Sequence, residues 1–488
     1  MLWLCMLGLA LASPERILDY TQAVLSHGPR AHGQPGELKT LEWVAEHLRA
    51  NGYEPEQVGD PGVLYACTDG TPRANALWFL AHTDAVGPQV PGAIDNAVAV
   101  AALVVLSEDL AAVPPPSQVC VAFPRAEELG LVGSVDWVAN HMPPTPGLVV
   151  ALDLVGQGQL SATGLGPLWG DEALSWLSQH KEVHAPVAYR VVSRQLGIER
   201  SDHAPFAQRG VLSMHLLGRG RSGIYWRYHS PLDDLSQVEG PAVDALHHTL
   251  LSMAHARPLP IQVPSAGLIL PVLGGVLPGS MVWLLWGAGL GISLFACRGW
   301  KAALHGLGAS FVGCFAGAGA WALAGWGRPQ AAGLATPLTL CWLLGMAAVL
   351  SAWPRQERTG QGSAMAFGLL ALAAGLFDPI MGVWLSLGAL ALGLGKWRPV
   401  LGLLGAALPV YVCAPATWRE LVFHHLLPDQ GVWYMPVRWL ACWPLAVLAL
   451  ALPRRRWASL FLFALCGVLL VVTRFLPPFS EAFPELGP

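Results

Sequence analysis

The sequence predicts a three-layer α/β/α domain with a mostly parallel, mixed sheet, followed by an all-α polytopic transmembrane domain. Strand-like apolar runs alternate with amphipathic helical patterns in the first half of the chain, which is typical of helices packed on both faces of a sheet. Long apolar runs separated by short basic loops fill the second half. A mean hydropathy of +0.46 is too apolar for a wholly soluble chain.

The expected domain boundaries follow this change in composition. Residues 1–12 end in Ala-Leu-Ala, which resembles a signal peptide cleaved before Ser13. No basic residue precedes the apolar run, as one would in a typical signal peptide, so a short uncleaved signal anchor is the alternative interpretation. We expect the α/β domain over residues 13–257, a Pro-rich linker over 258–265, the transmembrane domain over 266–478 and a short tail over 479–488.

Apolar spacing predicts the elements of the α/β domain. A period near 3.6 residues indicates a helix, and a short, continuously apolar run indicates a strand. Gly52 lies where a glycine commonly ends a helix. In chain order we predict helices over 14–27 and 35–53, a strand over 76–82, a helix over 97–111, a strand over 117–123, a helix over 134–142, strands over 147–156 and 210–218, and a helix over 241–256.

Metal-ligating side chains follow successive predicted strands. In parallel sheets, functional residues gather on the loops beyond the carboxyl ends of the strands. Imidazole and carboxylate ligands suit zinc, and two ions need one bridging carboxylate and two further ligands each. A lone histidine or Glu-Glu pair is more often structural or solvated, but the joint placement favours a two-metal site. The predicted ligands are His82, Asp95, Glu128, Asp153 and His229.

Six motifs in this order resemble the M28 family of zinc aminopeptidases: "HTD", "GAIDNA", "RAEELGLVGS", "LDLVG", "SDHAPFAQRG" and "YHSPLDDL". The resemblance covers about residues 15–256 and implies two zinc ions bridged by Asp95. His82 and Asp153 would complete one site, and Glu128 and His229 the other.

The same resemblance implies the catalytic roles. Glu127 would be the general base, taking a proton from a metal-activated water and passing it to the leaving amine. Asp84 would orient His82, and Tyr228 would donate to the developing oxyanion or simply pack as an aromatic. Asp202 and His203 match a family signature and are expected in the pocket wall or behind the ligands.

Several other polar residues fall outside the predicted catalytic set. Arg125 departs from the pattern of many relatives, which we interpret as affecting substrate preference. Four histidines match no motif and are predicted to lie on the surface or on helix faces: His180, His184, His247 and His248.

The nine cysteines show no C-x-x-C spacing, so neither a thiolate zinc site nor a disulfide framework is indicated. In the first half, Cys67 and Cys120 are the only plausible disulfide pair. Buried free thiols are the favoured interpretation.

About eight candidate spans follow the linker. Basic residues concentrate in alternate loops between them, which predicts that the α/β domain lies on the non-cytosolic side, in a lumen or periplasm. Few ionisable residues lie within the spans, which favours an anchor or platform over a transporter. The spans are near 279–297, 304–326, 331–353, 363–377, 379–395, 399–415, 437–452 and 457–473.

The predicted function is a membrane-anchored dizinc aminopeptidase, a hydrolase acting on peptides at a lipid bilayer. Up to residue 261 there are 15 basic and 26 acidic residues, and this acidic balance argues against nucleic-acid binding. Two alternatives stay open: a glutaminyl-peptide cyclase, known for M28-like folds with one zinc, and an inactive M28-like scaffold for membrane proteins. The complete ligand set argues against the scaffold.

Overall fold

The structure is a computed structural model that divides into two compact units, Met1–Gly279 and Ser280–Pro488. It describes residues 2–142, 144–166, 168–185, 201–220, 223–224, 227–256, 267–270, 275–296 and 372. The predicted spans from residue 304 onward lie outside the described residues, apart from Leu372.

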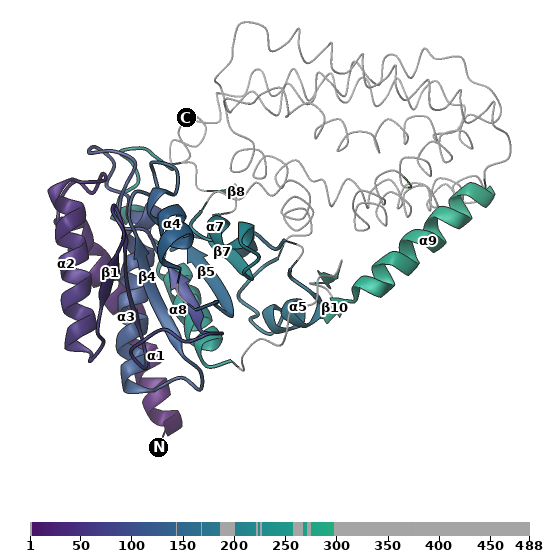
Figure 1. The fold of residues 1–488 in the computed structure, drawn as a ribbon, viewed down its shortest axis with the longest axis horizontal. Coiled ribbons are helices and arrows are strands. Elements are labelled where there is room, and N and C mark those ends of the chain that lie inside the picture. Colours follow the sequence, from purple (N-terminus) through teal and green to yellow (C-terminus); the bar gives the residue numbers. More distant parts are fainter. Residues whose placement is uncertain are drawn as a thin grey trace, which may run out of the picture. The chain divides into compact units, whose positions relative to one another are not determined.

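An eight-stranded mixed sheet organises the first unit (Figure 1), in the order β1-β2-β4-β3-β5-β7-β6, with β8 paired to β7. The four central strands β4, β3, β5 and β7 are parallel, whereas β2 and β6 pair antiparallel to their neighbours. This confirms the predicted mostly parallel, mixed sheet. The strands are β1 Glu56–Val58, β2 Val63–Cys67, β3 Leu77–Leu80, β4 Val119–Pro124, β5 Leu148–Leu152, β6 Gln159–Thr163, β7 Ser213–Gly220 and β8 Gly223–Ile224.

Helices cover both faces of this sheet because successive side chains of a strand point to opposite sides. On β3, Phe79 joins the core cluster that contains residues of α1, α2, α3 and α8. Trp78 joins a second cluster with Trp137 and Phe206. The helices are α1 Leu2–Ser26, α2 Pro35–Ala50, α3 Val98–Ala112, α4 Val132–Asp136, α5 Asp171–Leu177, α7 Ala204–Gln208 and α8 Gly240–Ala254. The predicted α/β/α layering is confirmed.

Most predicted elements are present within one to four residues of their expected ends. Gly52 adopts a left-handed φ of 82° after α2, as expected of a helix-ending glycine. Sequence patterns missed the strands β1, β2 and β6 and the short helices α5 and α7. These are brief elements of three to seven residues, and only β2 is a continuously apolar run.

His180 and His247, which were predicted to lie on the surface or on helix faces, are both buried, and His247 lies on α8. The His247 Nε2 atom lies 2.7 Å from Asp109 Oδ2, and Arg16 Nη2 donates to the other oxygen of that carboxylate at 2.6 Å. This polar network joins α1, α3 and α8 inside the core. A helical pattern shows which residues share a face, but it does not show that two helices will cover that face.

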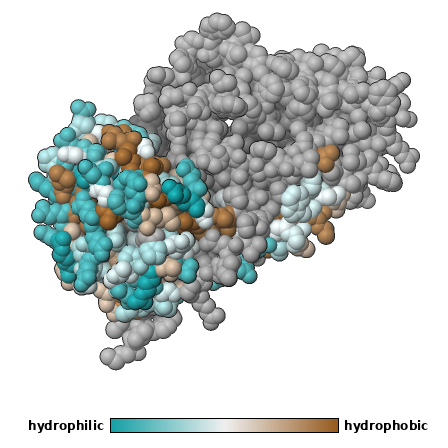
Figure 2. Space-filling model, in the orientation of Figure 1, coloured by the Kyte–Doolittle hydropathy of each residue, from teal (hydrophilic) through white to brown (hydrophobic). Residues whose placement is uncertain are grey.

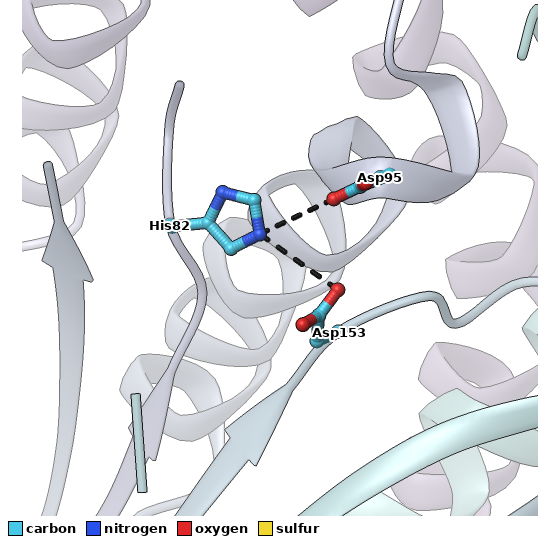
Figure 3. Close-up of side chains that lie close together, drawn as sticks. All are labelled: His82, Asp95 and Asp153. Atoms are coloured by element: carbon cyan, nitrogen blue, oxygen red, sulfur yellow. Dashed lines mark ion pairs between the residues drawn. The ribbon is translucent and has the colours of Figure 1, made fainter. Parts of the chain in front are cut away.

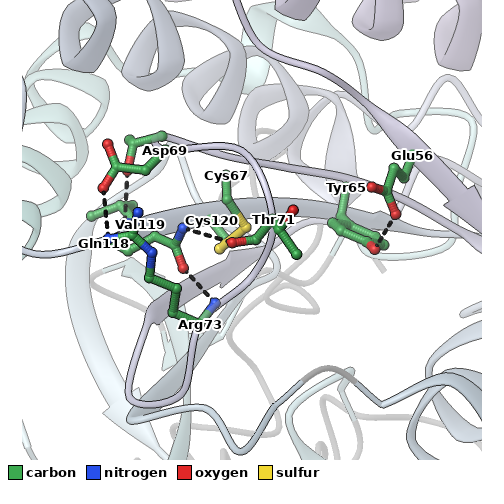
Figure 4. The surroundings of a disulfide bond; sticks show 10 residues. Glu56, Tyr65, Cys67, Asp69, Thr71, Arg73, Gln118, Val119 and Cys120 are labelled. Carbon is green, nitrogen blue, oxygen red and sulfur yellow. Dashed lines mark hydrogen bonds and ion pairs between the residues drawn. A yellow bond between two sulfur atoms is a disulfide. The ribbon is translucent and has the colours of Figure 1, made fainter.

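The interpretation of Cys67 and Cys120 as free thiols is also wrong, because the two residues form a disulfide (Figure 4). Cys67 ends β2 and lies directly opposite Cys120 on β4 in the antiparallel register. Both side chains are buried. Because β2 was not predicted, this register was not visible in the sequence.

A long helix and a small hairpin lie at the predicted boundaries of the α/β domain. α1 runs continuously from Leu2 past the predicted cleavage point at Ala12. Residues placed in the membrane domain form a small hairpin of β9, Leu268–Leu270, and β10, Gly275–Leu277.

The first predicted span coincides with α9, Gly279–Ala296. Large apolar side chains on α9 are exposed, among them Trp283 and Leu284, whereas the visible face of the α/β unit is mostly hydrophilic (Figure 2). Among the described helices, none is both long and apolar enough to cross a membrane.

Candidate metal centre

Three predicted ligands meet where two parallel strands end (Figure 3). His82 follows β3, and Asp153 directly follows the neighbouring strand β5. Asp95 comes from η1, a π-type turn over Ala93–Ala97 that leads into α3. The His82 Nε2 atom lies 3.3 Å from Asp95 Oδ1 and 3.8 Å from Asp153 Oδ1. All three residues are buried, so the set forms a compact polar site inside the domain.

A second set shares Asp95 with the first. The other oxygen of this carboxylate, Oδ2, lies 3.5 Å from His229 Nε2, and Glu128 Oε2 lies 2.7 Å from the same nitrogen. In each set, one ligand atom from every residue lies within 4.8 Å of the others. The structure therefore brings the five predicted ligands together, with Asp95 between the two groups.

Burial and mutual repulsion make this cluster of carboxylates unfavourable without a cation. Burial and the charge of Glu128 raise the pKa of Asp95 to about 7, and burial together with Asp153 and Asp84 raises the pKa of Glu128 to about 8. Burial also raises the pKa of Glu127 well above its usual range, an effect that Asp153 and other nearby carboxylates reinforce. A divalent cation would relieve this repulsion and hold the carboxylates ionised.

The donor set fits zinc. Buried Nε2 atoms of His82 and His229 face carboxylate oxygens but make no hydrogen bond within the described residues, which is the geometry expected of imidazoles that bind a metal. Each set offers one imidazole and two carboxylates, and this mixture suits Zn²⁺.

Asp84 fixes both the ligand His82 and the loop that carries the two glutamates. The His82 Nδ1 atom lies 3.1 Å from the Asp84 carbonyl oxygen and 3.6 Å from the Asp84 carboxylate. A proton on Nδ1 leaves Nε2 free to act as the metal ligand. The two carboxylate oxygens of Asp84 accept the backbone N–H groups of Glu127 and Glu128, each at 3.1 Å. Asp84 therefore ties the loop after β3 to the loop after β4.

The remaining predicted site residues surround these sets. The Tyr228 ring stacks on the His229 ring with a centroid distance of 3.5 Å. Asp202 is buried, and its pKa is raised to about 7 by burial and by the charges of Asp84 and Asp153. His203 is buried and stacks on the ring of His215, whose Nε2 lies 4.0 Å from Asp153 Oδ2. His215 was not among the predicted site residues.

Arg125 forms a buried ion pair with Glu37. Its Nε and Nη2 atoms donate to the two carboxylate oxygens of Glu37 at 3.1 and 3.0 Å, and Nη1 donates to the Pro61 carbonyl. Glu37 lies in the first turn of α2, so the pair attaches the chain just before Glu127 to the helical layer. Sequence reasoning missed Glu37 because a helical glutamate is usually solvated.

Arg125→Met is expected to destabilise the folded chain by about 3–5 kcal/mol, because it leaves the fully buried Glu37 carboxylate without its guanidinium. The double variant Glu37→Leu with Arg125→Met should be less destabilised than this single variant. Denaturant unfolding of the wild type, the two single variants and the double variant measures the free energy of unfolding of each protein. Arg73→Met, which disrupts an exposed pair with Asp69, is the control and should cost no more than about 1 kcal/mol. Additive single-site effects would contradict the assignment.

The free energy of unfolding should change with pH in opposite directions in chelator-treated and zinc-loaded protein. In chelator-treated protein the raised pKa values of Asp95 and Glu128 mean that the folded state binds more protons than the unfolded state between about pH 4 and 8. The free energy of unfolding should therefore fall as the pH rises through this window. His82 acts in the same direction, because nearby carboxylates raise its pKa despite its burial.

Zinc requires the same groups deprotonated, so zinc-loaded protein should gain stability over this pH range. Thermal unfolding from pH 5 to 8, with chelator and with zinc, measures both trends. Parallel trends in the two series would contradict this account of the site.

The α/β domain thus carries two adjoining His-carboxylate sets beyond its parallel strands, and each set could hold a metal ion. Residues 63–254 match the model of the family described as Peptidase family M28. This matched part of the chain contains all five predicted ligands.

The solved structures to which the chain is similar are distant from it in sequence. A Zn-dependent exopeptidase from Parabacteroides distasonis is 14% identical, covers 50% of this chain and 98% of its own, and has a TM-score of 0.42. A glutaminyl cyclase from Bacteroides thetaiotaomicron bound to N-acetylhistamine is 14% identical over 50% and 98% of the two chains, with a TM-score of 0.44. An aminopeptidase from Aneurinibacillus is 15% identical over 51% and 96%, with a TM-score of 0.41.

Proposed function

We propose that this chain is a dizinc aminopeptidase that hydrolyses the N-terminal peptide bond of peptide substrates. The observation that carries the proposal is the pair of ligand sets joined by the two oxygens of Asp95, one facing His82 and the other facing His229. The match to an M28 peptidase family supports the reaction class. His82, Asp95 and Asp153 would hold one zinc, and Asp95, Glu128 and His229 the other.

The residues around the ligands fit the steps of peptide hydrolysis. When bound, the zinc ions would supply Lewis-acid polarisation of the carbonyl and lower the pKa of water at the site. Glu127 would accept a proton from the attacking water and deliver it to the leaving amine. Asp84 holds the Glu127 backbone in place through its N–H group. Tyr228, stacked on His229, would donate its hydroxyl to the developing oxyanion.

A substrate panel on the purified full-length chain tests this proposal. Free aminoacyl-arylamides should be hydrolysed, N-acetylated versions should not, and a zinc chelator should abolish the reaction reversibly. Cyclisation of N-terminal glutamine without peptide hydrolysis would instead assign a cyclase. No reaction in zinc-loaded protein would contradict both enzymatic assignments.

We also propose that the domain is anchored to a membrane and works on its non-cytosolic side. The Cys67–Cys120 disulfide supports an oxidising compartment, and the alternating basic loops of the second half support the orientation. Extraction of the full-length chain from membranes should require detergent, and protease added to the cytosolic side should spare the domain. Release by alkaline carbonate would contradict the anchoring.

A further inference from the structure

We propose that Arg30 and Asp233 are positioning residues that together fix the loop between His82 and Asp95. This inference rests on the proposed zinc centre but concerns two residues that are not ligands. Both side chains are buried, and neither belongs to the predicted catalytic set. Both side chains form hydrogen bonds to backbone atoms of the loop. Arg30 supplies the donors and Asp233 the acceptors.

Arg30, between α1 and α2, supplies the donors. Its Nε atom donates to the Thr83 carbonyl at 3.2 Å, while Nη1 and Nη2 donate to the Pro91 and Gly92 carbonyls at 2.8 Å each. Its own carbonyl accepts the Ala85 N–H group at 3.1 Å. Thr83 immediately follows His82, and Gly92 immediately precedes η1. One guanidinium therefore joins both ends of the loop and constrains the separation of His82 from Asp95.

Gly92 makes this close approach possible. It adopts a left-handed φ of 68°, and a Cβ atom built there would lie 2.9 Å from Arg30 Nη2 and 2.4 Å from the Asp95 carbonyl oxygen. A side chain at this position would separate the guanidinium from the loop. The glycine in "GAIDNA" is therefore explained by contact with Arg30 as well as by its backbone conformation.

Asp233 supplies the acceptors on the other side. Its carboxylate oxygens accept the backbone N–H groups of Ile94 at 2.8 Å and Asp95 at 3.1 Å, and its carbonyl accepts the Ala93 N–H group. Asp233 lies four residues after His229, so these bonds also connect the chain segments that carry two ligands of one metal set. Residues that form hydrogen bonds to metal ligands in this way fix the orientation of those ligands.

The two positioning residues also carry opposite charges, so each reduces the cost of burying the other. A guanidinium with no opposite charge would be costly to bury, and the carboxylates of Asp233, Asp95 and Asp84 all favour the charged form of Arg30. The three loop carbonyls satisfy donors that would otherwise be buried without partners. Removing Arg30 should therefore loosen the loop rather than simply leave a space.

Zinc affinity of the full-length chain, measured by competition with a chelating dye, tests the proposal. Arg30→Ala should weaken zinc binding by about 10–100-fold. Added guanidinium ion at a non-denaturing concentration should restore part of the affinity, a rescue that a purely structural loss would not show. Arg30→Lys keeps the positive charge but not the planar set of N–H donors, so its zinc affinity should lie between those of the wild type and Arg30→Ala. Arg73→Ala, at an exposed arginine, is the matched control.

Asp233→Asn keeps the size of the side chain and replaces one acceptor by a donor, so it should also weaken zinc binding. If Arg30→Ala does not fold, Arg30→Lys and Asp233→Asn decide the question. Wild-type zinc affinity in these two variants, or in a folded Arg30→Ala, would overturn the positioning role. Failure of the wild-type chain to bind zinc would instead overturn the metal centre itself.

Discussion

Asp95→Asn is expected to abolish hydrolysis and to empty both metal sets, because Asp95 is the only residue that belongs to each of them among the described residues. Substituting an outer partner of a metal ligand already costs about 10–100-fold in affinity, so loss of the shared ligand should exceed 100-fold. Zinc content after dialysis, with hydrolysis of an aminoacyl-arylamide, measures the effect. We expect two zinc ions per wild-type chain and fewer than one per variant chain.

The matched control is Asp69→Asn, which makes the same chemical change at an exposed residue of the same unit. It should keep two zinc ions and full activity. Asp153→Asn should be intermediate, because Asp153 belongs only to the set with His82. Full zinc content in Asp95→Asn would show that the two sets do not share a bridging carboxylate.

Glu127→Gln is expected to lower the rate of hydrolysis by about 10²–10⁴-fold while the zinc content stays at the wild-type value. The substitution removes the proton acceptor but none of the five ligands, and general-base catalysis contributes about this factor. The fall should appear in kcat. Single-turnover kinetics on zinc-loaded protein, together with metal analysis of the same sample, measures both quantities.

The neighbouring residue provides the contrast. Glu128→Gln should lose zinc as well as activity, because the Glu128 carboxylate lies 2.7 Å from His229 Nε2 within the second set. Glu42→Gln, at an exposed position on α2, should change neither. Unchanged activity in Glu127→Gln would contradict the assignment of the general base, and zinc loss in that variant would exchange the roles of the two glutamates.

The sequence was sufficient to predict which five side chains come together at the candidate site, because each follows a recognisable strand or lies in a short motif. His82 and Asp153 come just after apolar runs that form β3 and β5, and parallel strands bring such positions to one edge. The conformation of the backbone at Asp95, within a π-type turn, was not predictable from spacing.

What the sequence did not reveal depends on contacts between distant segments. Arg30 and Glu37 lie in a polar stretch that looks solvated, yet they contact the loops that carry His82 and Glu127 because α2 packs against the sheet layer. Cys67 pairs with Cys120 only through the register of β2, a strand that sequence patterns missed. Burial of this kind depends on tertiary packing, which local periodicity does not describe.

Anomalous scattering at the zinc absorption edge, collected from crystals of zinc-loaded protein, tests the central claim most directly. The account predicts two peaks about 3.5–4 Å apart, one among His82, Asp95 and Asp153 and the other among Asp95, Glu128 and His229. A single peak, or peaks that do not share Asp95, would contradict it.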